Sequence, residues 1–298
     1  MQSIKRNIVA LKTIFVFFCT SQAFAQDDLL KELESSSEKE PSYTAQTFKG
    51  TRLINGHSVE TIGEGTLEFI FSHRFGRLNG GLYEMYGLDD AYVRLGLEYG
   101  VTDNFGIGIG RNSVDKTVDG YLKYKLVKQS REGSPVTVTA FGSTGYKTSP
   151  KDADVPDGFQ RTDRLSYTAQ LLIARKFTSA LSLQLMPTLV HKNWVALDEG
   201  DNNQVAVGVG GRIKMTPSVS VNLEYYYRVN PSAAASYNDA IGIAVDIETG
   251  GHVFQIILTN TRGMIERSFI TETDGDFFDG DIHLGFNVTR AFQLKGKR

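Results

Sequence analysis

Side chains of opposite character alternate without a break through residues 219–228, and similar segments recur along the chain. Every second position is apolar or aromatic, and the positions between them are polar or charged apart from one tyrosine: Val219, Val221, Leu223, Tyr225 and Tyr227 against Ser220, Asn222, Glu224, Tyr226 and Arg228. A period of two places the two sets on opposite faces of a β-strand. An apolar face ending in tyrosines, opposite a face with charged groups, is typical of a transmembrane barrel strand.

From Glu64 onward the chain contains about twelve such segments (range 10–14), each bounded by turn residues. The connections between them alternate in length. Tight turns at 101–104, 178–180, 215–218 and 248–251 are separated by longer joins near 76–89, 111–117, 144–162, 191–204, 229–239 and 260–281. Outer-membrane barrels have short turns in the periplasm and long loops outside the cell. Residues 64–298 are therefore predicted to form an all-β, antiparallel up-and-down transmembrane β-barrel with that loop arrangement. Residues 263–269 are expected to make a single helical turn, too short to count as an element.

The first 25 residues have the order of a secretory signal peptide. A basic start precedes a short apolar centre, and Ala23-Phe24-Ala25 forms a small-x-small cleavage site. We expect removal after Ala25 and location in the outer membrane of a Gram-negative bacterium. A short membrane anchor is disfavoured because a charge interrupts the apolar stretch. A lipoprotein acylated at Cys19, the single cysteine, is disfavoured because Phe17 and Phe18 stand where small residues are needed.

Residues 26–63 do not alternate like barrel strands. The part 29–40 is charged and rich in serine, which predicts a periplasmic leader. The part from Thr47 to Glu60 mixes apolar, glycine and polar residues, so lining the lumen or covering the barrel mouth stays open as an alternative.

Composition excludes other classes of protein. The chain has 32 Lys and Arg against 34 Asp and Glu, so it lacks the basic excess of a nucleic-acid-binding protein. No stretch after the leader is as long and apolar as a transmembrane helix.

Several short segments stand out in the sequence: Phe48-Lys49-Gly50-Thr51-Arg52-Leu53, residues 73–76, 87–89, 97–103, 108–111 and 123–126, and 280–287 with Arg290 and Phe292. Together they resemble an uncharacterised β-barrel family of Bacteroidota outer membranes, defined as a domain of unknown function. It covers most of the chain after residue 47. It implies a barrel and an outer-membrane location, and it brings no catalytic residues.

Charged residues on the polar side of the predicted strands are the main candidates for a site. They are Glu68, Arg74, Arg94, Glu98, Lys123, Lys125, Arg212, Glu224, Arg228 and Asp246. In a narrow barrel such groups either bridge the lumen in a packed salt-bridge network or line a thin polar path. If a path exists, its basic residues would favour small anions, and the acidic ones would weaken that preference. The basic residues in question are Lys123, Lys125, Arg94, Arg212 and Arg228.

Three other patterns have a weaker basis. The loop 271–281 carries Asp274, Asp276, Asp279 and Asp281, which makes it a weak candidate for calcium, although its spacing is not that of an EF-hand. The glycines of 106–110 lack the spacing of a nucleotide fingerprint and are interpreted as inner-face strand glycines. His73 and Ser72 point to opposite faces of one strand and cannot form a hydrolase pair.

These observations predict a narrow pore or transporter for small polar solutes. The alternative is a non-conducting structural barrel, or one that binds a periplasmic or surface protein, and a lipid hydrolase is a minor alternative. No enzyme activity, cofactor or nucleic-acid partner is expected, and the expected surroundings are outer-membrane lipid.

Overall fold

The computed structural model describes residues 42–44, 46–149, 155–156, 158–195, 201–231 and 236–295. The chain divides into two units, Met1–Ser42 and Tyr43–Arg298, and the fold belongs to the second. The predicted signal peptide and the predicted leader up to residue 41 lie outside the described residues.

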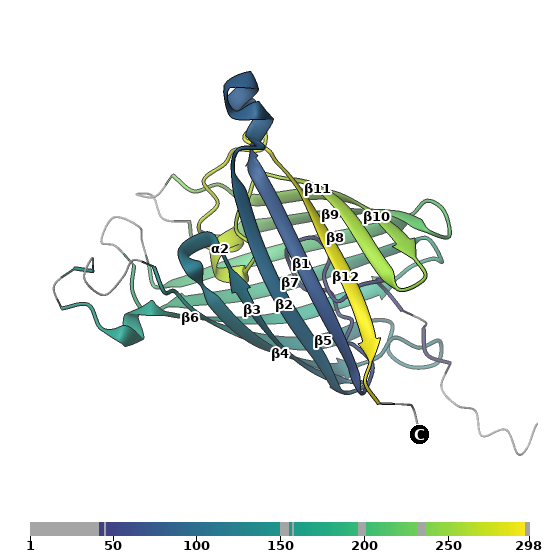
Figure 1. The fold of residues 1–298 in the computed structure, drawn as a ribbon. Helices are drawn as coiled ribbons and strands as arrows, with labels where there is room; N and C mark the ends of the chain where they lie inside the picture. The colour runs from purple at the N-terminus through teal and green to yellow at the C-terminus, as the bar shows by residue number, and fades with distance from the viewer. Residues whose placement is uncertain are drawn as a thin grey trace, which may run out of the picture. The chain divides into compact units, whose positions relative to one another are not determined.

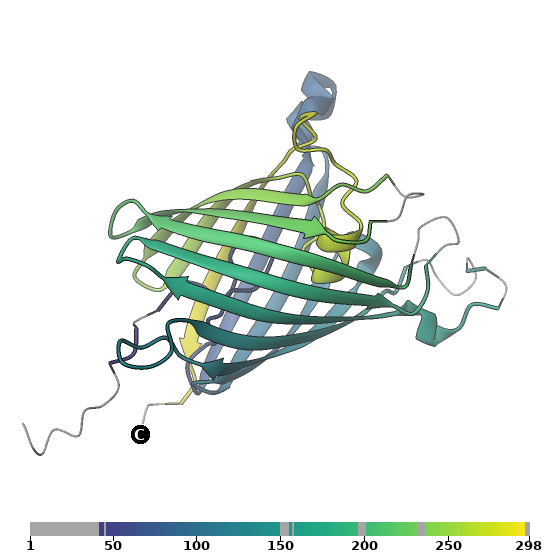
Figure 2. The same cartoon turned by 180° about the vertical axis from the view of Figure 1, so that it is seen from behind.

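Twelve antiparallel strands form a closed barrel in which each strand pairs with its neighbours in sequence and the last strand pairs with the first (Figures 1 and 2). The strands are β1 (Thr66–Arg77), β2 (Ala91–Thr102), β3 (Phe105–Asn112), β4 (Val118–Val127), β5 (Thr137–Tyr146), β6 (Leu165–Lys176), β7 (Leu181–Lys192), β8 (Asn203–Lys214), β9 (Val219–Arg228), β10 (Ala240–Thr249), β11 (His252–Thr259) and β12 (His283–Gln293). The prediction of an antiparallel barrel of about twelve strands is confirmed.

The described parts of the connections contain four short helices: η1 (Leu78–Gly87), η2 (Val114–Lys116), η4 (Arg161–Arg164) and α2 (Glu266–Thr271). The prediction that residues near 263–269 form no countable element is wrong, because α2 is a regular helix whose six residues are all buried. Within the described ranges, the structure contains no helix of the length and apolar character needed to cross a membrane.

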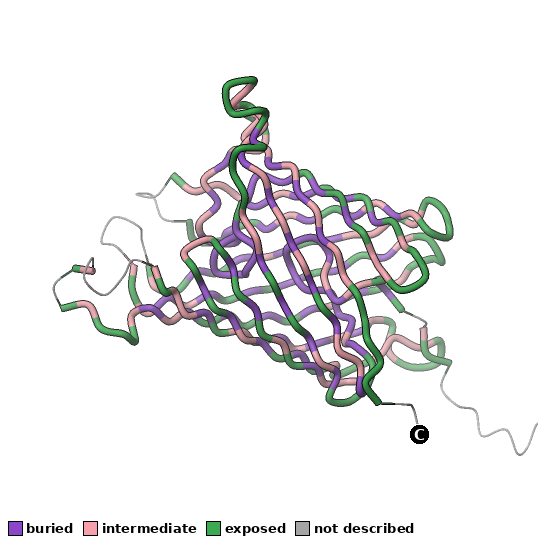
Figure 3. The backbone as a smooth tube through the Cα atoms, in the orientation of Figure 1, coloured by how far each residue is buried: buried purple, intermediate pink, exposed green. Residues whose placement is uncertain are grey.

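Exposure alternates through the central part of the strands, as the colours in Figure 3 show. Apolar side chains such as Leu97, Ile109 and Leu223 lie exposed on the outside of the barrel, while Arg94 and Glu98 are buried inside it. Because pleating sends successive side chains to opposite faces, the alternation in sequence becomes an apolar outer wall around a polar lumen.

The two ends of the barrel differ in their connections. We call the end with the connections 103–104, 128–136, 177–180, 215–218 and 250–251 the short-turn rim, and the end with 78–90, 113–117, 147–164, 193–202, 229–239 and 260–282 the long-loop rim. Thr66 pairs with Gln293, so the first and last strands begin and end at the short-turn rim. The alternation in length is broken at one place, where 128–136 is longer than 113–117. That longer turn pairs with the incoming chain, since Tyr43 bridges to Ser130.

Glycines on the inner face of the wall leave room for large side chains. A Cβ at Gly108 would overlap the ring of Tyr121, and a Cβ at Gly210 would overlap Leu53. The inner-face glycines of the strands therefore do not leave an open channel, because other side chains fill the space beside them.

Candidate functional site

The segment 47–62 lies inside the barrel, and we call it the luminal segment (Figures 1 and 2). Its apolar side chains Phe48, Leu53 and Val59 are buried in one cluster with inward-facing side chains of the wall. Side chains from strands on all sides of the ring contact it, namely from β1, β4, β5, β7, β9, β11 and β12. A segment with contacts on every side of a closed barrel occupies the lumen.

The luminal segment turns at residues 53–56. The backbone N–H of Leu53 donates to the carbonyl of Gly56 at 2.9 Å, and the N–H of Ser58 donates to the carbonyl of Thr51 at 3.0 Å. At the tip of this turn the Glu224 carboxylate accepts three backbone hydrogen bonds, from Ile54 at 3.2 Å, Asn55 at 3.1 Å and Gly56 at 2.9 Å. Bonds to a charged acceptor are stronger than bonds between neutral groups, so Glu224 is a strong holding point of the segment.

The carbonyl groups of the luminal segment are also bonded by side chains of the wall. Gln255 donates to Leu53 at 2.7 Å, Thr139 donates to Val59 at 2.8 Å, and Gln184 donates to His57 at 2.8 Å. Lys123 donates to the carbonyls of Thr51 and Glu60, Asn287 to that of Ile54, and Ser182 to that of Thr47. Buried backbone groups need such partners, and here the polar wall supplies them in place of a neighbouring strand.

All ten charged residues singled out from the sequence lie on the inner side of the wall. Eight are buried, and Lys125 and Arg212 are partly buried. The set does not form one network. Its contacts go either to the luminal segment, as for Glu68, Arg74, Lys123, Lys125 and Glu224, or to other wall and loop groups, as for Arg94, Glu98, Arg212, Arg228 and Asp246.

The five basic residues expected to attract anions do not form an open row along the lumen. Arg94 is fully buried and pairs with Asp119, Lys125 pairs with Glu60 at 3.2 Å, and Lys123 bonds to the luminal segment. Arg212 pairs with Glu248 and Arg228 pairs with Asp239. The expected attraction for anions would need these contacts to break.

Several charged partners were missed in the sequence. Asp119 stands on the same face as Tyr121 and Lys123, so alternation within residues 118–127 would have identified it. Glu60 and Asp239 lie outside the predicted strands, where no periodic pattern marks the direction of a side chain. Their roles depend on which strand end or segment folds back beside them.

Helix α2 lies in the lumen towards the long-loop rim and meets the luminal segment there. The ring of His57 lies with Nε2 3.4 Å from Oε1 of Glu266 and packs against Phe141 and Tyr121 at centroid distances of 4.3 and 4.6 Å. Burial, with nearby cations such as Arg52 adding to it, lowers the pKa of His57 well below 6.5. Burial also raises the pKa of Glu266, so the neutral forms of both groups are favoured.

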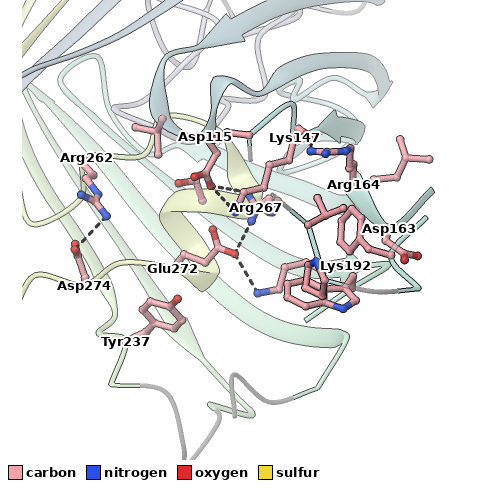
Figure 4. Close-up of a pocket in the computed structure, with 18 residues that line it drawn as sticks. Asp115, Lys147, Asp163, Arg164, Lys192, Tyr237, Arg262, Arg267, Glu272 and Asp274 are labelled. Atoms are coloured by element: carbon pink, nitrogen blue, oxygen red, sulfur yellow. Dashed lines mark hydrogen bonds and ion pairs between the residues drawn. The ribbon is translucent and has the colours of Figure 1, made fainter. Parts of the chain in front are cut away.

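A cavity of about 450 Å³ lies at the long-loop rim beside α2 (Figure 4). A chain of ion pairs lines it: Asp115 contacts Lys147 at 3.0 Å and Arg267 at 3.4 Å, and Glu272 contacts Arg267 at 2.7 Å and Lys192 at 3.2 Å. The pKa of Asp115 is lowered because the neighbouring cations outweigh its desolvation.

A second cavity of about 510 Å³ lies at the short-turn rim, between the luminal segment and the wall. Its lining includes Lys49, Gly50 and Glu60 of the luminal segment, together with Glu248 of β10. The luminal segment and α2 therefore stand between a cavity at each rim of the barrel.

The calcium site considered for the loop 271–281 is not assembled. Arg77 lies 3.4 Å from Asp274 and 3.2 Å from Asp281, and Asp281 also accepts from Asn79 at 2.7 Å. The bond from Asn79 is the main reason that the pKa of Asp281 is lowered. Across the described ranges, no three His, Cys, Asp or Glu side chains are grouped to hold a metal ion.

His73 lies on the outer side of β1, where its ring stacks on Phe286 with centroids 5.1 Å apart and planes 7° from parallel. Ser72 is buried on the opposite side of the same strand. These two residues therefore do not form a nucleophile and base pair.

Comparison with known proteins identifies the family of the chain. The model of a family described as a membrane-bound β-barrel domain (DUF5777) matches residues 48–292. No curated protein matches the chain by sequence.

Solved structures with a similar fold include the NanC porin (12% identity, TM-score 0.49, covering 76% of this chain and 100% of the porin) and the KdgM porin (10%, 0.47, 76% and 99%). An outer membrane channel from Pseudomonas putida F1 is also similar (14%, 0.42, 78% and 98%). The family match covers most of the chain and includes the luminal segment from Phe48 onward. The chain therefore belongs to the family of membrane-bound β-barrel domains DUF5777, whose function is unknown.

Proposed function

We propose that this protein is a narrow, gated pore of the outer membrane for small polar solutes, and that the luminal segment is its gate. The proposal rests above all on the way in which the segment is held. The hydrogen bonds that join its buried backbone at residues 53–60 to the wall are made by wall side chains, with Glu224 at the centre. Such bonds exchange readily for bonds to water, so the segment is able to leave without breaking any strand pairing of the wall.

The surface that the segment covers supports this proposal. The wall groups that bond to it, such as Gln184, Thr139 and Gln255, are polar and would meet water if it withdrew. A polar lumen of this kind admits water and hydrated solutes, whereas an apolar constriction excludes water. The family match begins at Phe48, which makes the segment part of the domain rather than an appended tail.

Two charged side chains of the luminal segment form ion pairs with the wall. Lys49 pairs with Glu248 of β10, and Glu60 pairs with Lys125 of β4, which lie on different parts of the wall. Both pairs lie near the short-turn rim, where the chain enters the lumen. Movement of the segment would expose charges of both signs at this rim, so we expect weak selection between small anions and cations.

A non-conducting barrel that binds a partner is the second candidate, and one feature favours it. Helix η1 projects beyond the long-loop rim (Figure 1) and leaves Leu82 and Tyr83 exposed to 75% and 94%. Exposed apolar side chains at the tip of a loop are common in contact surfaces. Under this reading the luminal segment is a permanent strut.

A disulfide lock separates the two candidates. A Cβ placed on Gly242 of β10 would lie 3.7 Å from the Cβ of Ile54, which is the normal spacing of a disulfide. The variant Ile54→Cys/Gly242→Cys, made with Cys19→Ser, should therefore tie the tip of the luminal segment to the wall when oxidised. Replacing Ile54 by cysteine also removes Cδ1 and Cγ2, the two Ile54 atoms that would lie nearest to the new Cβ at position 242.

Planar-bilayer recordings of the purified full chain supply the measurement. We expect discrete openings from the wild type and from the reduced double variant, silence after oxidation, and recovery on reduction. Each single-cysteine variant should be insensitive to oxidation, and this is the matched control. Equal conductance of the oxidised and reduced forms would overturn the gate, while silence of every form, including the wild type, would favour the non-conducting barrel.

A further inference from the structure

The cavity at the long-loop rim has a construction of its own, distinct from the gate. Its wall comes from loops that follow β3, β5, β7, β9 and β11, and α2 supplies Arg267 and Ser268 (Figure 4). Its volume of about 450 Å³ lies in the range of small-molecule sites. Loops carried on a rigid barrel are a common setting for binding residues.

The charged groups that line this cavity in the described part of the chain are nearly balanced, and most of them form ion pairs with one another. Among the residues that the structure describes, five basic and four acidic side chains line it. The central groups, Asp115, Lys147, Arg267, Glu272 and Lys192, form one continuous chain of contacts of 2.7 to 3.4 Å. These pairs hold donors and acceptors in place side by side and leave little net charge.

An aromatic pair completes the wall of the cavity. The rings of Phe159 and Trp194 meet edge to face with centroids 5.5 Å apart, and Trp194 is 44% exposed. The guanidinium of Arg164 lies over the ring of Phe159 at 5.4 Å. The indole therefore presents apolar surface next to the charged groups, and edge-to-face packing fixes its orientation.

We propose that this cavity binds a neutral saccharide of one or two units. A pyranose has an apolar C–H face that can cover the Trp194 ring, and hydroxyl groups that both donate and accept. Such a ligand uses the paired carboxylates and cations together without separating them. A strongly charged anion would have to break the pairs, and a purely apolar ligand would strip water from them without replacing its hydrogen bonds.

The sequence provides a direct reporter, because Trp194 is the only tryptophan in the chain. Its emission in the wild-type protein therefore reports occupancy of this cavity alone. The full chain is titrated in lauryldimethylamine oxide, since alkyl glycoside detergents would compete for the site. The probes are glucose, galactose, maltose and N-acetylglucosamine, with glucuronate and glucosamine as charged counterparts.

We expect a saturable blue shift with at least one neutral sugar, because stacking removes water from the indole. Calorimetry should show binding about tenfold weaker for Trp194→Ala, the loss expected for one stacked pair. Lys147→Ala, at a partly exposed position, should weaken binding severalfold without disturbing the fold. Tyr83→Ala removes an exposed aromatic side chain outside the cavity and should leave binding unchanged.

Two results would overturn the assignment. One is the absence of a saturable change with every neutral sugar, and the other is tighter binding of glucuronate than of glucose, which would make this an anion site. Binding is measured on protein in detergent and does not require conduction. Sugar binding by a silent barrel would therefore refute only the pore, and conduction without sugar binding would refute only this site.

Discussion

The substitution Glu224→Gln tests how the luminal segment is retained. The wild-type carboxylate accepts the N–H groups of Ile54 and Gly56 at Oε2 and that of Asn55 at Oε1. Glutamine has the same shape but only one acceptor oxygen. When its oxygen takes the Oε2 position, its amino group faces the N–H of Asn55, and two donors then oppose each other.

The cost follows from these three contacts. One bond to a charged acceptor is lost, which is worth about 1.5–3 kcal/mol, and the two that remain become weaker bonds to a neutral acceptor. Relief from burying the carboxylate offsets part of this loss. We expect a net loss of about 2 kcal/mol in retention of the segment, which corresponds to roughly a 30-fold larger population of the released state.

Two measurements report this population. Single-channel recording gives the open probability, and hydrogen exchange of the 53–58 backbone gives the opening free energy independently of conduction. Glu98→Gln is the matched control. Glu98 is also a fully buried luminal carboxylate, but its bond, at 3.1 Å, comes from Tyr121 of the wall.

The expected pattern is faster exchange at 53–58 and more frequent opening in Glu224→Gln, with both quantities unchanged in Glu98→Gln. Unchanged exchange at Ile54, Asn55 and Gly56 in the Glu224 variant would refute the reasoning, because these amides would then not depend on the carboxylate. Equal effects in both variants would also refute it, because general loss of luminal charge would then explain the result.

Two further substitutions and a change of pH have defined outcomes. Gly56→Ala places a methyl group against the hydroxyl of Tyr226, so unseating of the segment should become easier by about 1–3 kcal/mol, measured by the same exchange experiment. The pKa of His57 is lowered while the luminal segment lies in the lumen, and release of the segment would restore it to about 6.5. As the pH falls below about 6.5, protonation therefore favours the released segment, and the open probability should rise by up to about tenfold per pH unit. His57→Gln should abolish this rise; Glu266→Gln should steepen it, since the raised pKa of Glu266 acts in the opposite direction. Asp119→Ala leaves a buried guanidinium unpaired and should lower the free energy of unfolding by about 3–5 kcal/mol, visible as earlier heat unfolding on gels.

The wall of the barrel was predictable because its signal is local. Residues 219–228 alternate in sequence and form β9 over the same range, with the charged members facing inward. The loop arrangement was predictable in the same way, because turn residues mark the strand ends, except at the longer turn 128–136. Helix α2 is a second exception, because its extent was underestimated. Its six residues are too few to be stable alone, and their burial in the lumen stabilises the helix.

The candidate site was predictable only in part. Alternation identified which charged groups face the lumen, but it did not identify their partners. Glu224 and Arg228 both face the lumen from β9, but Glu224 bonds to residues 54–56 and Arg228 bonds to Asp239. The rim cavity was missed entirely, because its residues come from five separate loops with no common pattern.

By itself, the sequence determined that this chain is a barrel with an apolar outer wall and a charged inner one, because a period of two is a property of neighbouring residues. Only the tertiary structure decided that the lumen is filled, and by what. The bond from Gly56 to Glu224 joins positions 168 residues apart, and that from Val59 to Gln184 joins positions 125 apart. Contacts of that separation arise when closure of the barrel brings distant strands around one segment, and no local pattern encodes them.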